Sequence, residues 1–263
     1  MIASDAVTTR HYCTAFATIV RKEISRFTRI WLQTVLPPAI TMSLYFIIFG
    51  HLIGPRIGRM HGFEYMQYIA PGIIMMSVIT NSYSNVVSSL FGAKFQRHIE
   101  EILVAPIPDI LIVIGFVAGG VARGLIVGAV VTVVALCFTD IHISSFSITL
   151  SVVFLTATLF SLAGFINALT ARKFDDISIV PTFILTPLTY LGGVFYSIDL
   201  LPHFWQQASR VNPIFYMVNA FRFGMLGVSD IKIGVAFSVI CLMITALFTV
   251  CMVLMHRGVG LRS

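Results

Sequence analysis

Charged side chains are scarce in this sequence, which has 17 basic and 11 acidic residues among 263. They make up 11% of the chain, against roughly 25% in an average soluble domain, so they are too few to cover a soluble surface of this size. Hydrophobic residues make up 57%, and the mean hydropathy is +0.94. This composition excludes a soluble enzyme, a nucleic-acid-binding domain and a disordered chain. It predicts a membrane protein that crosses the bilayer several times.

Motifs of catalytic, metal and ion-conducting sites are also missing. The sequence has no GxxxxGK[ST] phosphate loop, no HExxH, no GxSxG and no TVGYG. Its few cysteines show no metal-ligand spacing, and we expect them in the core or facing lipid: Cys13, Cys137, Cys241 and Cys251. We therefore expect a chain with no catalytic residue, no metal site and no cofactor of its own.

Long apolar runs, by contrast, are abundant. Six of them cover, to within a few residues, 31–53, 68–91, 110–137, 147–169, 177–197 and 232–255. A helix needs about 20 apolar residues to cross the hydrocarbon layer, and continuous rather than alternating runs favour helices over strands. Residues 1–30 lack the apolar core of a signal peptide, so we expect the first run to be an uncleaved anchor. The prediction is an all-α, polytopic, single transmembrane domain over residues 1–263, with six transmembrane helices.

The distribution of lysine and arginine predicts the orientation of these spans. With the N-terminus inside, the inner segments hold 11 of the 17 basic residues, the outer segments hold 5, and Arg123 lies within a span. Lysine and arginine accumulate on the cytoplasmic side of membrane proteins. Both termini are therefore predicted to be cytoplasmic.

Residues 11–30 are predicted to form an amphipathic helix in the cytoplasmic interface of the bilayer. Apolar side chains fall on one face at helical spacing: Phe16, Val20, Ile24, Phe27 and Trp31. Another face carries Lys22, Arg26 and Arg29, which we expect near lipid phosphates, with Trp31 at headgroup depth. A membrane anchor and a docking surface for a cytoplasmic partner are both compatible with this pattern.

A second amphipathic segment, 92–108, connects the second and third runs on the inner side. Its apolar stripe consists of Phe95, Ile99, Ile102 and Leu103, and its charged side chains are Lys94, Arg97, Glu100 and Glu101. Arg97 and Glu101 lie four residues apart and can pair on a helix. Two interpretations stay open: a solvated helix on the membrane surface, or a helix that inserts into a groove of another protein.

Polar side chains interrupt three of the spans: Asn81 and Asn85 in the second, Arg123 in the third and Asn167 in the fourth. The amides are expected to bond neighbouring helices or to line a translocation path. An arginine at the centre of a helix costs about 2.5–3.5 kcal/mol in lipid, so Arg123 should face the bundle interior or water, as a structural or a path residue. Small residues beside it predict a close approach of another helix: Gly120, Gly124 and Gly128.

The outer stretch 198–231 is too apolar for an ordinary loop. One short helix is predicted from Pro202 to Ser209, and a second over about 213–226. Asn212 is the expected N-cap of the second helix and Pro213 its first residue. Two such helices could dip into the outer leaflet where protein or a water-lined cavity covers their ends.

Together these features resemble the membrane subunit of type-2 ABC exporters. The resemblance covers almost the whole chain: the interfacial helix, six spans, the helix after the second span and the broken outer hairpin before the last. The segments that look like the family's signature are Leu201-Pro202, Val211-Asn212-Pro213 and Arg222. Residues 91–97, 174–178 and 188–196 are similar to a bacterial inner-membrane permease of this family.

The resemblance implies a non-catalytic permease subunit in the bacterial inner membrane, working as a homodimer with two copies of a separate ABC ATPase that binds ATP and Mg. It implies that 94–103 is the coupling helix, with Lys94, Phe95, Arg97, Ile99, Glu100, Glu101 and Ile102 facing the ATPase. It also implies a dimer seam that involves the first and fifth spans and the outer short helices.

The transported substrate is not specified by the family, and we expect a hydrophobic or amphiphilic cargo. A secondary transporter and a non-transporting membrane scaffold are the alternatives. The acidic residues fall at span ends or in loops, which disfavours ion-coupled transport. A neighbouring gene for a Walker-A ATPase would separate these classes.

Overall fold

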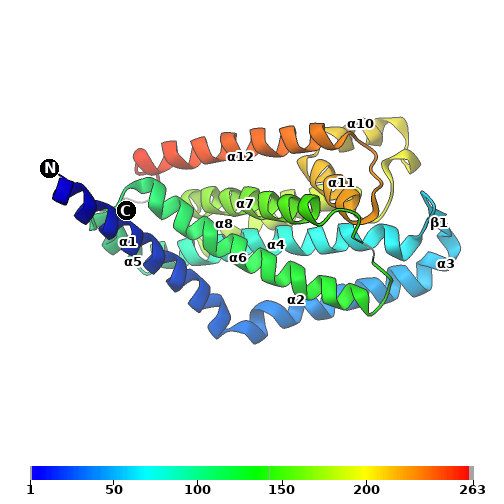
Figure 1. Cartoon of the computed structure of the whole chain (residues 1–263), viewed down its shortest axis with the longest axis horizontal. Helices are drawn as coiled ribbons and strands as arrows, with labels where there is room; N and C mark the ends of the chain where they lie inside the picture. Colours follow the sequence, from blue (N-terminus) through cyan, green and yellow to red (C-terminus); the bar gives the residue numbers. More distant parts are fainter. Residues whose placement is uncertain (1, 142, 261–263) are drawn as a thin grey trace.

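The computed structural model describes residues 2–141 and 143–260, and most of these residues are helical. Its long helices form an elongated bundle (Figure 1). The centre consists of α4 (Tyr65–Phe95), α6 (Asp109–Leu136) and α7 (Phe146–Thr170). On one flank α12 (Ile233–His256) packs against α7, and on the opposite flank α2 (Trp31–Tyr45) packs against α6.

The two ends of the bundle differ in structure. One end, called the α5 end here, carries the short helix α5 (His98–Val104), the N-terminal end of α1 (Ile2–Arg29) and the last turn of α12. The other, the α3 end, carries α3 (Gly54–Ile57) and a hairpin of β1 (Arg59–Met60) and β2 (Phe63–Glu64). The hairpin turns through His61 and Gly62, with φ of 50° and 86°. Positive φ at both central residues matches the twist of the flanking strands.

Within the described part of the chain, four helical segments are long and apolar enough to cross a membrane: Trp31–Ile57, Asp109–Leu136, Phe146–Thr170 and Ile233–His256. They coincide within a few residues with four of the six predicted runs. The first of them is continuous through η1 (Phe46–Ile53), where the helix widens to π geometry. A fifth predicted run, 68–91, lies within α4, which carries more polar side chains than these four.

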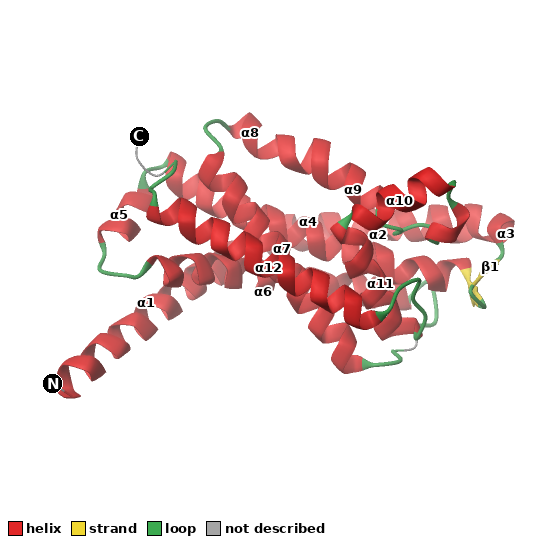
Figure 2. Cartoon of the chain, turned by 90° about the horizontal axis from the view of Figure 1, so that it is seen from above, coloured by secondary structure: helices red, strands yellow, loops and turns green. Residues whose placement is uncertain are grey.

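The remaining run, 177–197, was predicted with the wrong boundaries. The helical segment consists of α8 (Phe174–Ile179), η2 (Val180–Leu185) and α9 (Thr186–Leu191), and it follows one edge of the bundle in Figure 2. It ends at Leu191, and the chain turns through Gly193, where φ is 73°. The apolar residues after the turn, including Val194 and Phe195, are buried in the bundle as irregular chain. Hydropathy alone could not distinguish them from a continued helix.

The N-terminal helix is longer than predicted. α1 extends over Ile2–Arg29, and a break at Ile30 (φ −110°, ψ 35°) separates it from α2. The two helices meet there at an angle in Figure 1, because the peptide at Ile30 leaves helical geometry. α1 packs against α6 and extends from this break to the α5 end, so it does not continue the line of α2.

The short helices before α12 agree closely with the sequence. A turn, η3 (Ile198–Leu200), precedes α10 (His203–Val211) and α11 (Pro213–Leu226). Asn212 caps α11, since its Oδ1 accepts a hydrogen bond of 3.0 Å from the Ile214 amide. The predicted N-cap and first helical residue are confirmed.

Glycines of α6 allow the close helix packing that their spacing predicted. A Cβ at Gly120 would meet Ser161 of α7 and, at 2.6 Å, a methyl group of Val86 in α4. A Cβ at Gly124 would collide with the Ser82 hydroxyl of α4. The centre of the bundle therefore depends on small residues that bring the helix backbones together.

Candidate functional site

The segment between α4 and α6 forms a compact structure at the α5 end. α4 continues through Phe95, and the chain then turns at Arg97, which has the left-handed conformation (φ 62°) before α5 begins. Lys94 and Phe95 thus belong to α4, and the predicted single helix over 94–103 is wrong in this respect. The predicted pair of Arg97 with Glu101 is absent among the described residues, because Arg97 precedes the helix.

The short helix α5 has one anchored face and one free face. Ile99 is buried, Ile102 is half-buried, and Glu100 and Glu101 are exposed. Both carboxylates lie in the first turn, where the helix dipole favours negative charge. The exposed surface of α5 is therefore acidic and held in place by the apolar residues beneath it.

Lys94 ties this segment to the end of α7. Its ammonium donates hydrogen bonds to the carbonyls of Leu169 (2.8 Å) and Ala171 (2.6 Å), which have no helical partners at a C-terminus. Burial lowers the pKa of Lys94, Arg172 lowers it further, and Asp176 opposes both. The α4–α5 and α7–α8 junctions are thus joined by one charged side chain.

Aromatic contacts reinforce the same junction. The ring of Phe174, at the start of α8, lies 5.0 Å from that of Phe91 and 4.8 Å from that of Phe95. Asp176 caps α8 by accepting hydrogen bonds from the Arg172 amide (2.8 Å) and the Lys173 amide (3.0 Å). These two bonds hold the pKa of the Asp176 carboxyl below its ordinary value. Two segments singled out in the sequence, 91–97 and 174–178, are thereby brought together.

The buried face of α1 differs from the predicted one. Ile19, Glu23 and Phe27 are buried, whereas Phe16, Val20 and Ile24 of the predicted apolar face are only half-buried. The buried face meets small residues of α6: a Cβ on Gly115 would lie 2.6 Å from Ile19, and one on Gly119 would lie 2.5 Å from Glu23. α1 therefore packs into the bundle through a seam of glycines.

A polar cluster lies between α1 and α4. Arg26 donates to Asn85 Oδ1 (2.8 Å) and to the Asn85 carbonyl (2.9 Å), so its guanidinium points inward and not, as expected, toward lipid phosphates. Glu23 accepts a 2.7 Å bond from the Ser89 hydroxyl and lies 3.5 Å from Arg26. Lys22, Arg29 and Trp31 are exposed.

Sequence reasoning missed Glu23, the fully buried carboxylate of this cluster. Its signal was its spacing of four residues from both Ile19 and Phe27, which places the three on one face of a helix. That face was overlooked because the larger apolar set, from Phe16 to Trp31, is centred to one side of it and shares only Phe27 with it.

The polar residues of the spans fall into two groups. Arg123 donates to Asn81 Oδ1 at 3.1 Å, which joins α6 to α4 within the bundle. Asn167 of α7 donates to the Tyr83 hydroxyl of α4 at 2.7 Å. Each of these bonds links two helices, as expected for structural polar residues, and a role in a path stays a prediction.

Arg222 organises the α3 end. It is fully buried, and its guanidinium donates to the carbonyls of Gly193 (2.6 Å) and Tyr68 (3.3 Å) while its Cζ lies 4.1 Å from the centre of the Tyr68 ring. The Asn212 amide donates to the Leu188 carbonyl at 2.5 Å. The two residues connect α11 to α4, α9 and the buried turn, while Pro202 only precedes α10 and is exposed.

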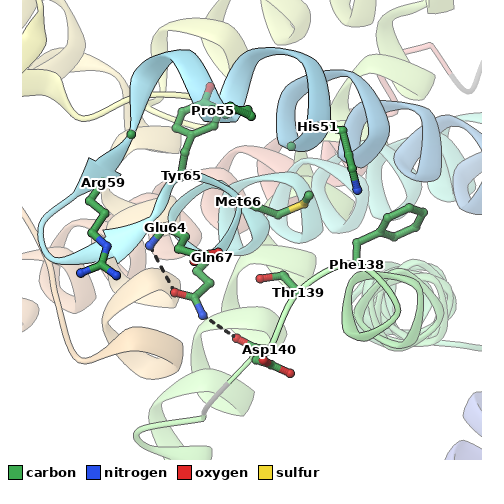
Figure 3. Close-up of a pocket in the computed structure, with 13 residues that line it drawn as sticks. His51, Pro55, Arg59, Glu64, Tyr65, Met66, Gln67, Phe138, Thr139 and Asp140 are labelled. Atoms are coloured by element: carbon green, nitrogen blue, oxygen red, sulfur yellow. Dashed lines mark hydrogen bonds between the residues drawn. The ribbon is translucent and has the colours of Figure 1, made fainter.

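Two cavities differ in character. One of about 610 Å³ at the α3 end has polar side chains from several elements, including His51, Arg59, Glu64 and Asp140 (Figure 3). The other, of about 450 Å³, is an apolar groove formed by α6, α7 and α12. The candidate path residues, Asn81, Asn85, Arg123 and Asn167, line neither.

Known proteins share this chain's sequence over most of its length. Residues 14–226 match the family described as ABC-2 type transporter. The chain is 59% identical over 252 residues to the inner membrane transport permease YadH of Escherichia coli (strain K12), covering 96% of this chain and 98% of the relative. It is 26% identical over 215 residues to nodulation protein J of Rhizobium leguminosarum bv. viciae, covering 81% of this chain and 83% of that protein.

Proposed function

Because the chain belongs to the ABC-2 type transporter membrane family, we propose that it is the permease subunit of an exporter driven by a separate ABC ATPase. The relative that shares 59% of its residues is named an inner membrane transport permease, which supports a location in the bacterial inner membrane. On this proposal the ATPase binds ATP and Mg, and this chain supplies the route across the membrane.

The proposed topology has six spans and cytoplasmic termini. The four long apolar segments account for four spans, and α4 together with the segment α8–α9 would supply the other two. Basic residues gather at the α5 end, where Lys94, Arg97, Arg172 and Lys173 flank the helix junctions. The positive-inside rule then makes the α5 end cytoplasmic, in line with the orientation predicted from the whole sequence.

The observation that carries the proposal is that α5 is packed against the bundle on one face and exposed on the other. Its exposed face carries Glu100 and Glu101, and its Ile99 is buried against the bundle. The bonds of Lys94 tie the adjoining last turn of α4 to the end of α7. A force applied to α5 would be carried into both long helices, because packed helices move as rigid elements. We therefore propose α5, with the last turn of α4, as the coupling helix.

The proposed assembly is a homodimer of this chain with two ATPase subunits. Apolar side chains lie exposed along α2 and along η2, including Leu44 and Phe183. These surfaces belong to the first and fifth predicted runs and would supply much of the dimer seam. The apolar groove of α6, α7 and α12 supports a hydrophobic or amphiphilic cargo.

The test requires the partner ABC ATPase, sought as a Walker-A protein encoded near this gene, and uses the complex purified with it. Reversing two charges, Glu100→Lys with Glu101→Lys, should weaken either ATPase binding or stimulated hydrolysis. The matched control, Asp140→Lys, reverses a charge at the α3 end and should change neither. ATP hydrolysis by the chain alone, or an unaffected complex in the double variant, would refute the proposal. A chain that binds no ATPase would favour a secondary transporter or a scaffold.

The cargo calls for a separate experiment. Reconstituted complex is screened for compounds that stimulate ATP hydrolysis, with amphiphilic and hydrophilic compounds tested in parallel. Stimulation by amphiphiles alone is the expected result. Stimulation by hydrophilic compounds alone would contradict the proposed cargo class while leaving the coupling proposal intact.

A further inference from the structure

Three chain segments at the α3 end bring a histidine and two carboxylates together. His61 lies in the turn of the hairpin, Asp199 in η3, and Asp230 in the connection from α11 to α12. One ligand atom from each lies within 4.8 Å of the others, and His61 Nε2 is 3.9 Å from Asp230 Oδ1. Asp199 and Asp230 follow His61 by 138 and 169 positions in the sequence, and the fold brings the three side chains together.

We propose that these three side chains bind a divalent first-row transition-metal ion such as Zn²⁺. Ligand atoms held at about 2.0–2.2 Å from one such ion lie roughly 3–4 Å apart. The His61–Asp230 distance of 3.9 Å already falls in this range, and small side-chain rotations would bring all three atoms, which lie within 4.8 Å, to it. Imidazole suits these ions and carboxylates complete the set, with water taking any remaining position. The proposal departs from our own sequence-based expectation that the chain holds no metal site, because the three residues show no spacing that the sequence could reveal.

Asp230 supplies the second and independent observation. Its side chain is only 9% exposed, and its Oδ2 is buried without a hydrogen-bond partner among the described residues. A buried carboxylate with an unpaired oxygen is costly unless a cation or a donor meets it. The other oxygen, Oδ1, faces His61, and the Ser197 hydroxyl lies 3.5 Å from both.

The nearby Arg222 attracts the Asp230 carboxylate by charge but gives its hydrogen bonds to other groups. Arg222 directs its guanidinium to the carbonyls of Gly193 and Tyr68 and to the side chain of Asn219 (3.5 Å). Within residues 2–141 and 143–260, Asp230 makes no ion pair with Arg222, and it lies 3.9 Å from the His61 imidazole, which is charged only when protonated. The unpaired Oδ2 of Asp230 is therefore available to a cation that His61 and Asp199 could also bind.

A metal ion in this position would fasten three segments of the α3 end to one another. It would hold the hairpin turn against η3 and against the start of α12. Binding energy of this kind adds directly to the stability of the folded chain, since the unfolded chain does not present the ligands together.

The experiment uses the full chain in detergent, prepared without a polyhistidine tag and stripped with EDTA. Cys13, Cys137 and Cys241 are exposed thiols and are replaced by serine in every preparation, because thiolates also bind zinc. Zn²⁺ binding is measured by isothermal titration, and the unfolding temperature is recorded with Zn²⁺ and with EDTA. The expected result is one ion per chain and a higher unfolding temperature in Zn²⁺.

Two variants test the assignment. His61→Asn removes the imidazole but creates Asn-Gly, a favoured pair for this turn, so the hairpin should be kept. Asp230→Asn keeps the shape of the side chain and removes its charge. Each should lower Zn²⁺ affinity by at least about tenfold. Even the loss of a group that only hydrogen-bonds to a metal ligand lowers metal affinity by about 10–100-fold. The control, His203→Asn, alters an exposed histidine on α10 and should bind as the parent does.

Two outcomes would overturn the site. One is Zn²⁺ binding that is unchanged in His61→Asn and Asp230→Asn. The other is a parent chain that Zn²⁺ does not stabilise, combined with an Asp230→Asn variant that is less stable in EDTA. The second result would make Asp230 a distant counter-charge for Arg222 instead of a metal ligand. Neither result depends on the proposed transport activity.

Discussion

Arg222 is a fully buried side chain that joins several segments of the α3 end. Arg222→Met should lower the free energy of unfolding by about 1–3 kcal/mol, because the buried carbonyls of Gly193 and Tyr68 lose their donor. The thermal unfolding midpoint in detergent measures the change. Arg210→Met, on the exposed last turn of α10, is the control and should have little effect. Equal midpoints for the two variants would contradict the structural role of Arg222.

Asp176 gives a prediction about pH. Its pKa lies below the ordinary carboxyl value of 3.8, so the cap it forms is fully present above that value and is lost as pH falls through the folded-state pKa. Asp176→Asn should therefore speed amide exchange at Arg172 and Lys173 near neutral pH, and the difference from the parent should shrink in acid. Hydrogen exchange at matched pH measures it. Asp175→Asn is the control, and the same loss of protection there would argue against the cap.

The role of a residue could be predicted where it depends only on its neighbours in the sequence. Asn212 followed by Pro213 defines a helix start within two residues, and the structure confirms it. The partner of Arg26 was not predictable, because Asn85 lies 59 residues away and only packing brings it near. Glu23 was obscured for a related reason: charge suggests a solvated face, while its burial depends on glycines in another helix.

At the scale of elements, the seam between α1 and α6 can be tested with a matched pair of glycines. Gly119→Ala should destabilise the chain by about 1–3 kcal/mol, because the new methyl group would lie 2.5 Å from the Glu23 Cβ. Gly92→Ala, in α4, meets no atom of the described residues within 4 Å and should be neutral or stabilising, since alanine favours a helix. Unfolding midpoints compare the two. A Gly119→Ala variant as stable as Gly92→Ala would mean that α1 does not pack tightly on α6.

Helix boundaries were predicted best where a continuous apolar run covers the whole helix. The runs at 110–137 and 147–169 match α6 and α7 to within one residue at each end. The run at 177–197 failed because a buried turn can be as apolar as a helix. The boundary between α4 and α5 was also missed, because the left-handed conformation of Arg97 has no signature in an ordinary side chain.

At the scale of the whole molecule, the proposed dimer seam predicts which flank meets a second copy. In a two-fold dimer, a residue on one surface of the first chain contacts a different residue on the second, and the reverse contact also forms. Chains with Leu44→Cys mixed with chains with Phe183→Cys should therefore be joined by a bifunctional maleimide. The exposed native cysteines are first replaced by serine.

The control for this prediction lies on the opposite flank. Leu242 in α12 is 71% exposed and Phe183 is 74% exposed. Cysteines placed at these two positions should therefore react with maleimide at similar rates. Leu242→Cys should give no cross-linked dimer with Leu44→Cys chains. Cross-linking through Leu242→Cys alone would place the seam on α12 and contradict the proposal.

The burial of Glu23 also bears on the order in which the molecule is assembled during synthesis. α1 precedes the first apolar run, so it leaves the ribosome before α6 exists to cover the carboxylate. Because a charge is costly in lipid, and because inserted helices can pack after insertion, α1 is made first and docks late. We expect protease to cut α1 in nascent chains that stop before α6 and to spare it once α6 has been made. Equal cutting of both would show that α1 finds its place without α6.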